Sequence, residues 1–365
     1  MSARSLIGLF GATGYTGRLV AQALDRLAVP WVAIGRNPGA IDEVRAQFEH
    51  CAAARVADTA HPQSLTEAFE GCRVIISAVG PFEHHGLAAL DAALAVGAHW
   101  TDTSAEQPWT RQALARNDRA RKAGCVVLPA NGCIYAFHHA ASAYLAQRLG
   151  PLRAVDSYLW LDHYDPTRGT AVSALAASRS RPLTLRNAAL KTAPASVHRI
   201  ALAGRSGHAV PLSGAEVILL PQAHPQLREA RTWLVLSAFE AYGFLAGTVL
   251  GPSLPERVLQ FANGGVRNRL VDPSPERRAD ARFTVCVRTS GARGVGTARI
   301  DGSDVYGITG ESVALTAAAL IQAEPRTLGT QTLDQVIDMD AWWNAMHTRG
   351  ITLTMEGPDG QAHAA

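Results

Sequence analysis

Three glycines at three-residue intervals, Gly11, Gly14 and Gly17, are the first feature of this 365-residue sequence that could support chemistry. An apolar run over residues 6–10 precedes them, and an amphipathic segment over residues 19–27 follows. A strand, a glycine turn and a helix in this order form a dinucleotide site, in which the glycines permit a tight turn and close approach of a pyrophosphate. The unpaired N–H groups at the helix start then face the phosphates. We predict such a site rather than a plain structural turn, with contacts from Gly11, Thr13, Gly14, Tyr15, Thr16 and Gly17.

The second predicted strand covers residues 31–34. The residues that follow it indicate which dinucleotide binds. NAD sites of this kind usually place Asp or Glu there to hold the ribose 2′-hydroxyl. This sequence has Arg36 and Asn37 instead, and no carboxylate follows until Asp42. A guanidinium suits bidentate binding of a 2′-phosphate, so we predict NADPH as the cofactor. The alternative is that Arg36 is a solvated loop residue.

Two further loops follow predicted strands, where ligands of an open α/β sheet bind. Asp58 follows a brief strand over residues 55–57 and would either touch the adenine or cap the next turn. The buried strand 74–79 leads into a loop in which Pro81 and Phe82 would form a rigid apolar wall beside the nicotinamide. Alternatively this loop only starts the next helix. The cofactor contacts predicted here are Val79, Gly80, Pro81 and Phe82.

A fifth strand, residues 99–102, precedes Ser104, which we add to the cofactor contacts. Glu106 lies three residues after Thr103 and fits a capping box, in which its side chain would bind the backbone at the start of the following helix.

The proton donor is predicted just past the sixth strand, residues 125–128, where Tyr135, His138 and His139 follow. His163 and Tyr164 are the next choice. For each histidine on its own, a structural or surface role is the favoured alternative. Short-chain dehydrogenases share the glycine motif but use a Tyr with a Lys four residues later, and no tyrosine here has that partner. The five cysteines contain no CxxC pair, so they indicate reduced thiols and no metal site.

Alternating strands and helices over the first 131 residues predict an α/β fold, a doubly wound Rossmann domain with six parallel strands. Beyond it, the alternating strand 155–164 and the hairpin 282–300 indicate a second α+β domain on a mixed or antiparallel sheet. Residues 181–232 are predicted to form short strands and loops rich in Pro and Gly, because they show no clear helical period. We predict an NADP-binding domain over residues 1–131 and a substrate domain over residues 132–305. The C-terminal helices, over residues 306–365, are predicted to pack back on the first domain.

Composition favours a two-domain cytoplasmic protein, with 47% hydrophobic and 18% charged residues. The net charge of +3 comes from scattered arginines, which gives nucleic-acid binding little support. Residues 233–250 are strongly apolar but are interrupted by Glu240, so we expect a buried or surface-lying helix and leave a weak membrane contact open. A homodimer is also left open.

The sequence resembles the saccharopine dehydrogenase-like oxidoreductases, and more closely the branch with trans-acting enoyl reductases. The resemblance rests on the segments 11–17, 35–36, 79–86, 99–106, 168–173 and 304–310. It implies a Rossmann domain, a mixed-sheet domain that closes over the nicotinamide, and NADPH-dependent reduction. The family commonly follows its sixth strand with Cys-Gly-Phe-Asp-Ser, whereas this sequence has Asn-Gly-Cys-Ile-Tyr over residues 131–135. That loop borders the substrate, which is therefore left open.

We accordingly expect hydride delivery from NADPH to a polarised C=C bond of an enoyl or enone substrate, or to the C=N bond of an imine. The substrate would be a small molecule or a carrier-bound biosynthetic intermediate. The rival interpretation is a non-catalytic NADP(H)-binding sensor.

Overall fold

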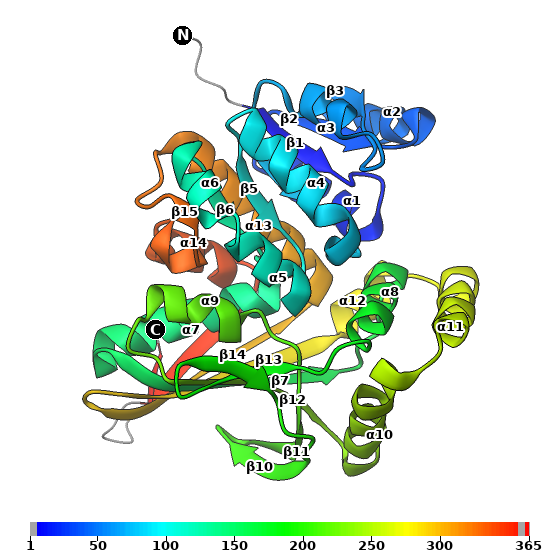
Figure 1. Cartoon of the computed structure of the whole chain (residues 1–365). Helices are drawn as coiled ribbons and strands as arrows, with labels where there is room; N and C mark the ends of the chain where they lie inside the picture. Colours follow the sequence, from blue (N-terminus) through cyan, green and yellow to red (C-terminus); the bar gives the residue numbers. More distant parts are fainter. Residues whose placement is uncertain (1–5, 357–361, 365) are drawn as a thin grey trace. The chain divides into compact units, whose positions relative to one another are not determined.

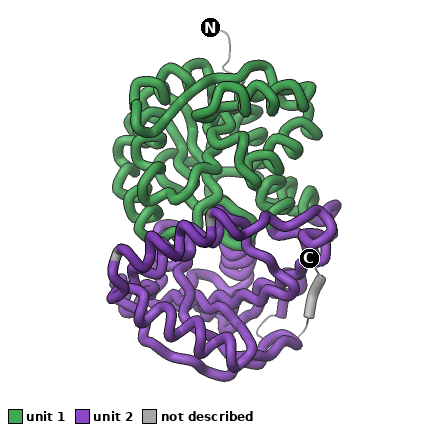
Figure 2. The backbone as a smooth tube through the Cα atoms, turned by 90° about the vertical axis from the view of Figure 1, so that its right-hand side faces the viewer, with its two compact units in different colours: residues 1–136, 306–346 green, residues 137–305, 347–365 purple. Residues whose placement is uncertain are grey.

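The computed structural model describes residues 6–356 and 362–364, which divide into two compact units (Figure 2). Residues 6–136 and 306–346 form unit 1, and the other described residues form unit 2. The predicted C-terminal part, residues 306–365, is therefore divided, because the strand 352–356 pairs within the sheet of unit 2.

Unit 1 contains a seven-stranded parallel sheet with β1 near its centre (Figure 1). The order is β15-β6-β5-β4-β1-β2-β3, so the six predicted strands have the doubly wound arrangement and β15 adds a seventh. The strands are β1 (Leu6–Phe10), β2 (Trp31–Gly35), β3 (Cys51–Val56), β4 (Cys72–Ser77), β5 (His99–Asp102), β6 (Val126–Leu128) and β15 (Gly329–Thr330). The helices are α1 (Tyr15–Arg26), α2 (Pro38–Gln47), α3 (Pro62–Phe69), α4 (Phe82–Ala95), α5 (Gln107–Leu114), α6 (Asn117–Lys122), α13 (Val305–Gln322), η2 (Leu333–Gln335) and α14 (Met339–His347).

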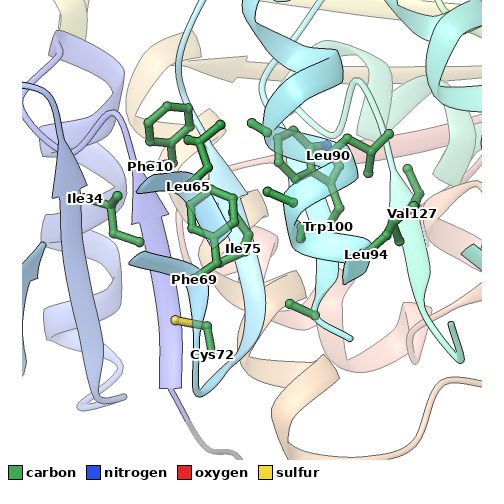
Figure 3. Close-up of a cluster of buried hydrophobic side chains, with 14 of the residues drawn as sticks. Phe10, Ile34, Leu65, Phe69, Cys72, Ile75, Leu90, Leu94, Trp100 and Val127 are labelled. Atoms are coloured by element: carbon green, nitrogen blue, oxygen red, sulfur yellow. The ribbon is translucent and has the colours of Figure 1, made fainter. Parts of the chain in front are cut away.

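Both faces of this sheet are buried. Phe10 lies in a cluster of apolar side chains from the strands and from α3 to α6, some of which Figure 3 shows. Its neighbour Leu9 points to the opposite face and is also fully buried. Strands of a parallel sheet that is covered on both faces need such continuous apolar runs, which is why their positions were predictable.

Unit 2 contains a mixed sheet in which β12 and β7 are parallel and the other pairs along the main path are antiparallel. The main path is β10-β11-β12-β7-β13-β14-β16-β17, with β8 and β9 beside β12. The strands are β7 (Leu152–Asp162), β8 (Leu183–Arg186), β9 (Ala189–Thr192), β10 (His198–Leu202), β11 (Arg205–Pro211), β12 (Glu229–Leu236), β13 (Arg282–Gly291), β14 (Gly294–Ser303), β16 (Thr352–Glu356) and β17 (Ala362–Ala364). The helices are α8 (Arg168–Ala177), α9 (Glu216–Ala223), α10 (Ala238–Leu250), η1 (Gly251–Ser253), α11 (Glu256–Arg269) and α12 (Pro275–Asp280), and α7 (Cys133–Leu149) begins in unit 1 and continues here.

The α/β fold class with a second, mixed-sheet domain is confirmed. The prediction of one helix over residues 233–250 is wrong, because its first residues belong to β12 and pair with β7. The helix α10 begins only at Ala238, after the N-cap residue Ser237, whose side chain forms a capping box with Glu240. No helix among the described residues is long and apolar enough to cross a membrane.

Candidate dinucleotide-binding site

The glycine turn between β1 and α1 places the backbone of Gly11 close to the backbones of Gly17 and Ile34. Gly11 has φ of +90°, and its N–H donates to the carbonyl of Ile34 over 2.9 Å. A Cβ atom at Gly17 would lie 2.1 Å from the carbonyl oxygen of Gly11, so only glycine allows α1 to start this close to the turn. Gly14 differs, because a Cβ there would meet only the oxygen of Gly11 at 3.4 Å. The side of Gly14 is therefore open to a ligand.

The N-terminus of α1 carries no side-chain cap. Gly14 is the N-cap residue and has no side chain that could cap the helix, and the first turn contains no acidic residue. The first N–H groups of a helix have no partner within the helix and mark the positive end of its dipole. This end of α1, where Tyr15 and Thr16 follow Gly14, can therefore bind the phosphates of a dinucleotide.

The side chains after β2 have different roles. Asn37 is the N-cap of α2, and its Oδ1 accepts a hydrogen bond from the N–H of Ala40 over 3.2 Å. Arg36 is exposed, and no hydrogen bond or ion pair within the described residues involves its guanidinium. The Arg36 side chain is thus available to a ligand at the carboxyl end of β2.

Asp58 caps its own turn after β3. Its Oδ1 accepts a hydrogen bond from the N–H of Ala60 over 3.0 Å, and its N–H donates to Ser64 Oγ over 3.1 Å. This geometry matches the turn-capping alternative for Asp58, and its adenine contact stays a prediction.

Glu106 fixes the loop that follows β4. Its two carboxylate oxygens accept hydrogen bonds from the N–H groups of Phe82 and Glu83, over 3.0 and 2.8 Å, at the start of α4. The capping-box interpretation with Thr103 is wrong, since Glu106 is itself the N-cap of α5 and its side chain caps another helix. Phe82 is buried against Trp109, so what this loop can offer a cofactor is mainly its backbone from Val79 to Pro81. The apolar wall stays a prediction.

Asp102 connects the loops after β5 and β6. Its Oδ1 accepts hydrogen bonds from the N–H groups of Ser104 and Ala130, over 3.0 and 2.9 Å. Its Oδ2 accepts from the indole N–H groups of Trp100 and Trp109, both over 2.8 Å. Burial raises the pKa of this carboxyl, and the hydrogen bonds from its neighbours oppose that shift. Asp102 therefore sets the position of Ser104 at the edge of the sheet, a role that sequence reasoning missed.

Helix α13 packs on α1 from outside the predicted Rossmann domain. A Cβ atom at Gly310 would lie 2.9 Å from both the carbonyl carbon and oxygen of Leu19 in α1. Tyr306 packs edge-on against Tyr15, with ring centroids 5.6 Å apart, and Glu311 forms an ion pair with Arg26. The residue that begins α1 is thus supported by a helix almost 300 positions later in the chain.

The sequence of the domain that contains this site is similar to that of a known family. Residues 7–128 match the family model described as the saccharopine dehydrogenase NADP binding domain. Over these residues, about a third of the chain, the sequence is similar to that family.

A human saccharopine dehydrogenase-like oxidoreductase is 25% identical over 41% of this chain and 40% of its own length. A trans-acting enoyl reductase of Mycobacterium ulcerans is 32% identical over 30% of this chain and 27% of its own. The chain thus spans well under half the length of these curated relatives. The apo structure of saccharopine dehydrogenase (L-Glu forming) from Saccharomyces cerevisiae matches 99% of this chain and all of that chain, with 12% identity and a TM-score of 0.61, which supports the fold.

The predicted proton donors lie on α7, after the residues that match the family model. The boundary between the two units follows residue 136, so Tyr135 and the two histidines belong to different units. Tyr135 lies in unit 1 and is buried. His138 lies in unit 2, fully buried, with its Nδ1 paired to Oε1 of Glu216 on α9. Burial lowers the pKa of His139 to about 4, so this ring is neutral near pH 7. His163 is largely exposed beside Asp280, 3.2 Å away. The donor role of each residue stays a prediction.

The contact of α13 with α1 yields a test. We expect Gly310→Ala to weaken dinucleotide binding about tenfold, because the added methyl group meets the backbone of α1, which cannot move away without shifting the phosphate-binding end. Fluorescence titration with NADPH gives the dissociation constant. Gly264→Ala on α11 is the matched control, since nothing lies within 4 Å of its added Cβ. Equal affinity of Gly310→Ala and the wild type would contradict the role given to α13.

Proposed function

We propose that this protein is an NADPH-dependent oxidoreductase that reduces an activated C=C bond, enoyl or enone, or a C=N bond, imine. The substrate would be a small molecule or a carrier-bound biosynthetic intermediate. The observation that carries the cofactor choice is the exposed, unpaired Arg36 at the end of β2, where a carboxylate would favour the unphosphorylated dinucleotide. The family of the N-terminal domain and the relatives with oxidoreductase and enoyl reductase names support the reaction class.

In this proposal the chain mainly binds and orients. The N–H groups at the start of α1 hold the pyrophosphate, and Arg36 holds the 2′-phosphate. The loop from Val79 to Pro81, fixed by Glu106, borders the nicotinamide ring, which supplies the hydride. Conjugated alkenes and imines accept hydride readily, so one proton donor suffices.

Among the predicted donors, Tyr135 fits best. His138 is already paired with Glu216, and the low pKa of His139 leaves it without a second proton at neutral pH. Turnover that is unchanged in both Tyr135→Phe and His139→Ala would exclude this part of α7 as the proton source.

The choice of cofactor is tested at Arg36. We expect Arg36→Ala to raise the dissociation constant for NADPH about tenfold to a hundredfold, because a charge-assisted bidentate contact with the 2′-phosphate is lost. The constant for NADH should stay within about twofold. Calorimetric titrations with both dinucleotides give these values, and Arg111→Ala, which removes an exposed arginine of α5, is the control. An equal loss for NADPH and NADH would overturn the assignment.

The reductase itself is tested against the rival, a non-catalytic NADP(H) sensor. The protein is incubated with NADPH and a panel of enoyl thioesters, enones and cyclic imines, and the loss of NADPH absorbance is followed. We expect repeated turnover with at least one class, and the class that reacts decides between C=C and C=N reduction. Tight NADPH binding without turnover on any member would favour the sensor.

A further inference from the structure

Unit 2 carries an exposed apolar surface that the proposed reaction does not use. It consists of the outer sides of α10 and α11 and the residues that join them, and we call it the α10–α11 face. Phe239 is 91% exposed and Phe261 is 85% exposed, and Tyr242 and Leu250 are about 60% exposed. Single exposed apolar residues are ordinary on protein surfaces, but several of them on two consecutive helices, with two phenylalanines among them, indicate an interaction site.

The exposed residues of α10 form one stripe. Positions 239, 242, 243, 246, 247 and 250 recur at intervals of three and four residues, and all of them are exposed. This stripe contains no charged residue. Glu240 lies at its edge, and its carboxylate accepts hydrogen bonds from both the hydroxyl and the N–H of Ser237. This stripe on the 13-residue helix is therefore uncharged, and apart from the Tyr242 hydroxyl apolar, over about 20 Å.

The next helix adds positive charge to the apolar side chains. On α11, Val258 and Phe261 are exposed together with Arg257 and Arg269, and no ion pair within the described residues involves either arginine. Asp272 follows α11, but its carboxylate is bound to Arg168. Among the side chains described over residues 237–272, the charges without an ion pair are thus two arginines and one carboxylate, that of Glu240, so positive charge is in excess.

We propose that the α10–α11 face docks on an anionic lipid surface. Helices of this kind lie in the plane of the interface, with aromatic and aliphatic side chains among the acyl chains and arginines at the level of the headgroups. Phe239 and Phe261 would enter the lipid, and Arg257 and Arg269 would pair with anionic headgroups. The helix α10 would lie flat, in keeping with the lack of a membrane-spanning helix among the described residues.

Charge favours lipid over a second copy of this chain. A two-fold symmetric contact sets a surface against itself, which would bring Arg257 and Arg269 of both copies to the same interface. Among the described residues of the face, each copy offers only one carboxylate without an ion pair, that of Glu240, against two such arginines. An anionic lipid surface supplies the missing negative charge.

The test is co-flotation of the full chain with vesicles of phosphatidylcholine, alone or mixed with phosphatidylglycerol. We expect binding to the mixed vesicles that falls at high salt and is weak on neutral ones. Phe239→Ser combined with Phe261→Ser should lower the binding constant about tenfold or more, through the loss of apolar burial. Arg257→Gln combined with Arg269→Gln should lower it about fivefold per charge on the mixed vesicles only.

Matched controls are Val56→Ser, an exposed apolar residue of unit 1, and Arg111→Gln, both of which should leave flotation unchanged. Thermal stability and NADPH affinity of the double variants check that they fold. Absence of binding by the wild type, or binding that none of the face variants alters, would overturn the proposal. A wild-type dimer that becomes monomeric in the phenylalanine variant, without vesicle binding, would assign the face to a second copy instead.

Discussion

The close contact between the backbones of Gly11 and Gly17 is the constraint on which the rest of the site depends. It brings the start of α1 directly against the turn after β1, at a distance that a single methyl group would prevent. The N–H groups of the first turn then emerge beside the open side of Gly14, at the carboxyl edge of the sheet. A second glycine contact, between Gly310 and the backbone at Leu19, holds the same helix from the side of α13.

Two buried carboxylates organise the neighbouring loops in a comparable way. Glu106 binds the first N–H groups of α4, and Asp102 binds backbone N–H groups of the loops after β5 and β6 and the indole N–H groups of Trp100 and Trp109. Each carboxylate offers several acceptor sites to donors that would otherwise be buried without partners. Loops that follow three adjacent strands are thereby fixed by side chains that lie behind the predicted ligand site.

Much of unit 1 could be predicted from the sequence, because a parallel sheet covered on both faces needs continuous apolar strands and these are visible as runs. The glycine roles were equally accessible, since they follow from local spacing. The function of Gly310 was not, because its contact with Leu19 joins residues far apart in the chain. Glu106 shows a related limit: its position favours a local capping box, but a tertiary contact with α4 prevails.

Unit 2 was harder to predict. The segment Glu216–Ala223 forms helix α9, although it contains Pro221 and has no clear apolar period, because its first turn is buried with Glu216 beside His138. Helix α11 contains the adjacent glycines Gly264 and Gly265, which locally favour a loop. Helix α9 thus depends on its surroundings more than on its own sequence.

The most direct test of the account is calorimetric titration of NADPH into the wild type and into Gly14→Val. A Cβ atom at Gly14 would meet only the carbonyl oxygen of Gly11, at 3.4 Å, and the valine side chain would occupy the path of the pyrophosphate. We predict measurable binding by the wild type and a loss of affinity of about tenfold or more in Gly14→Val, with thermal unfolding as the check that the variant is folded. Absence of binding by the wild type, or equal affinity of the two proteins, would contradict the account.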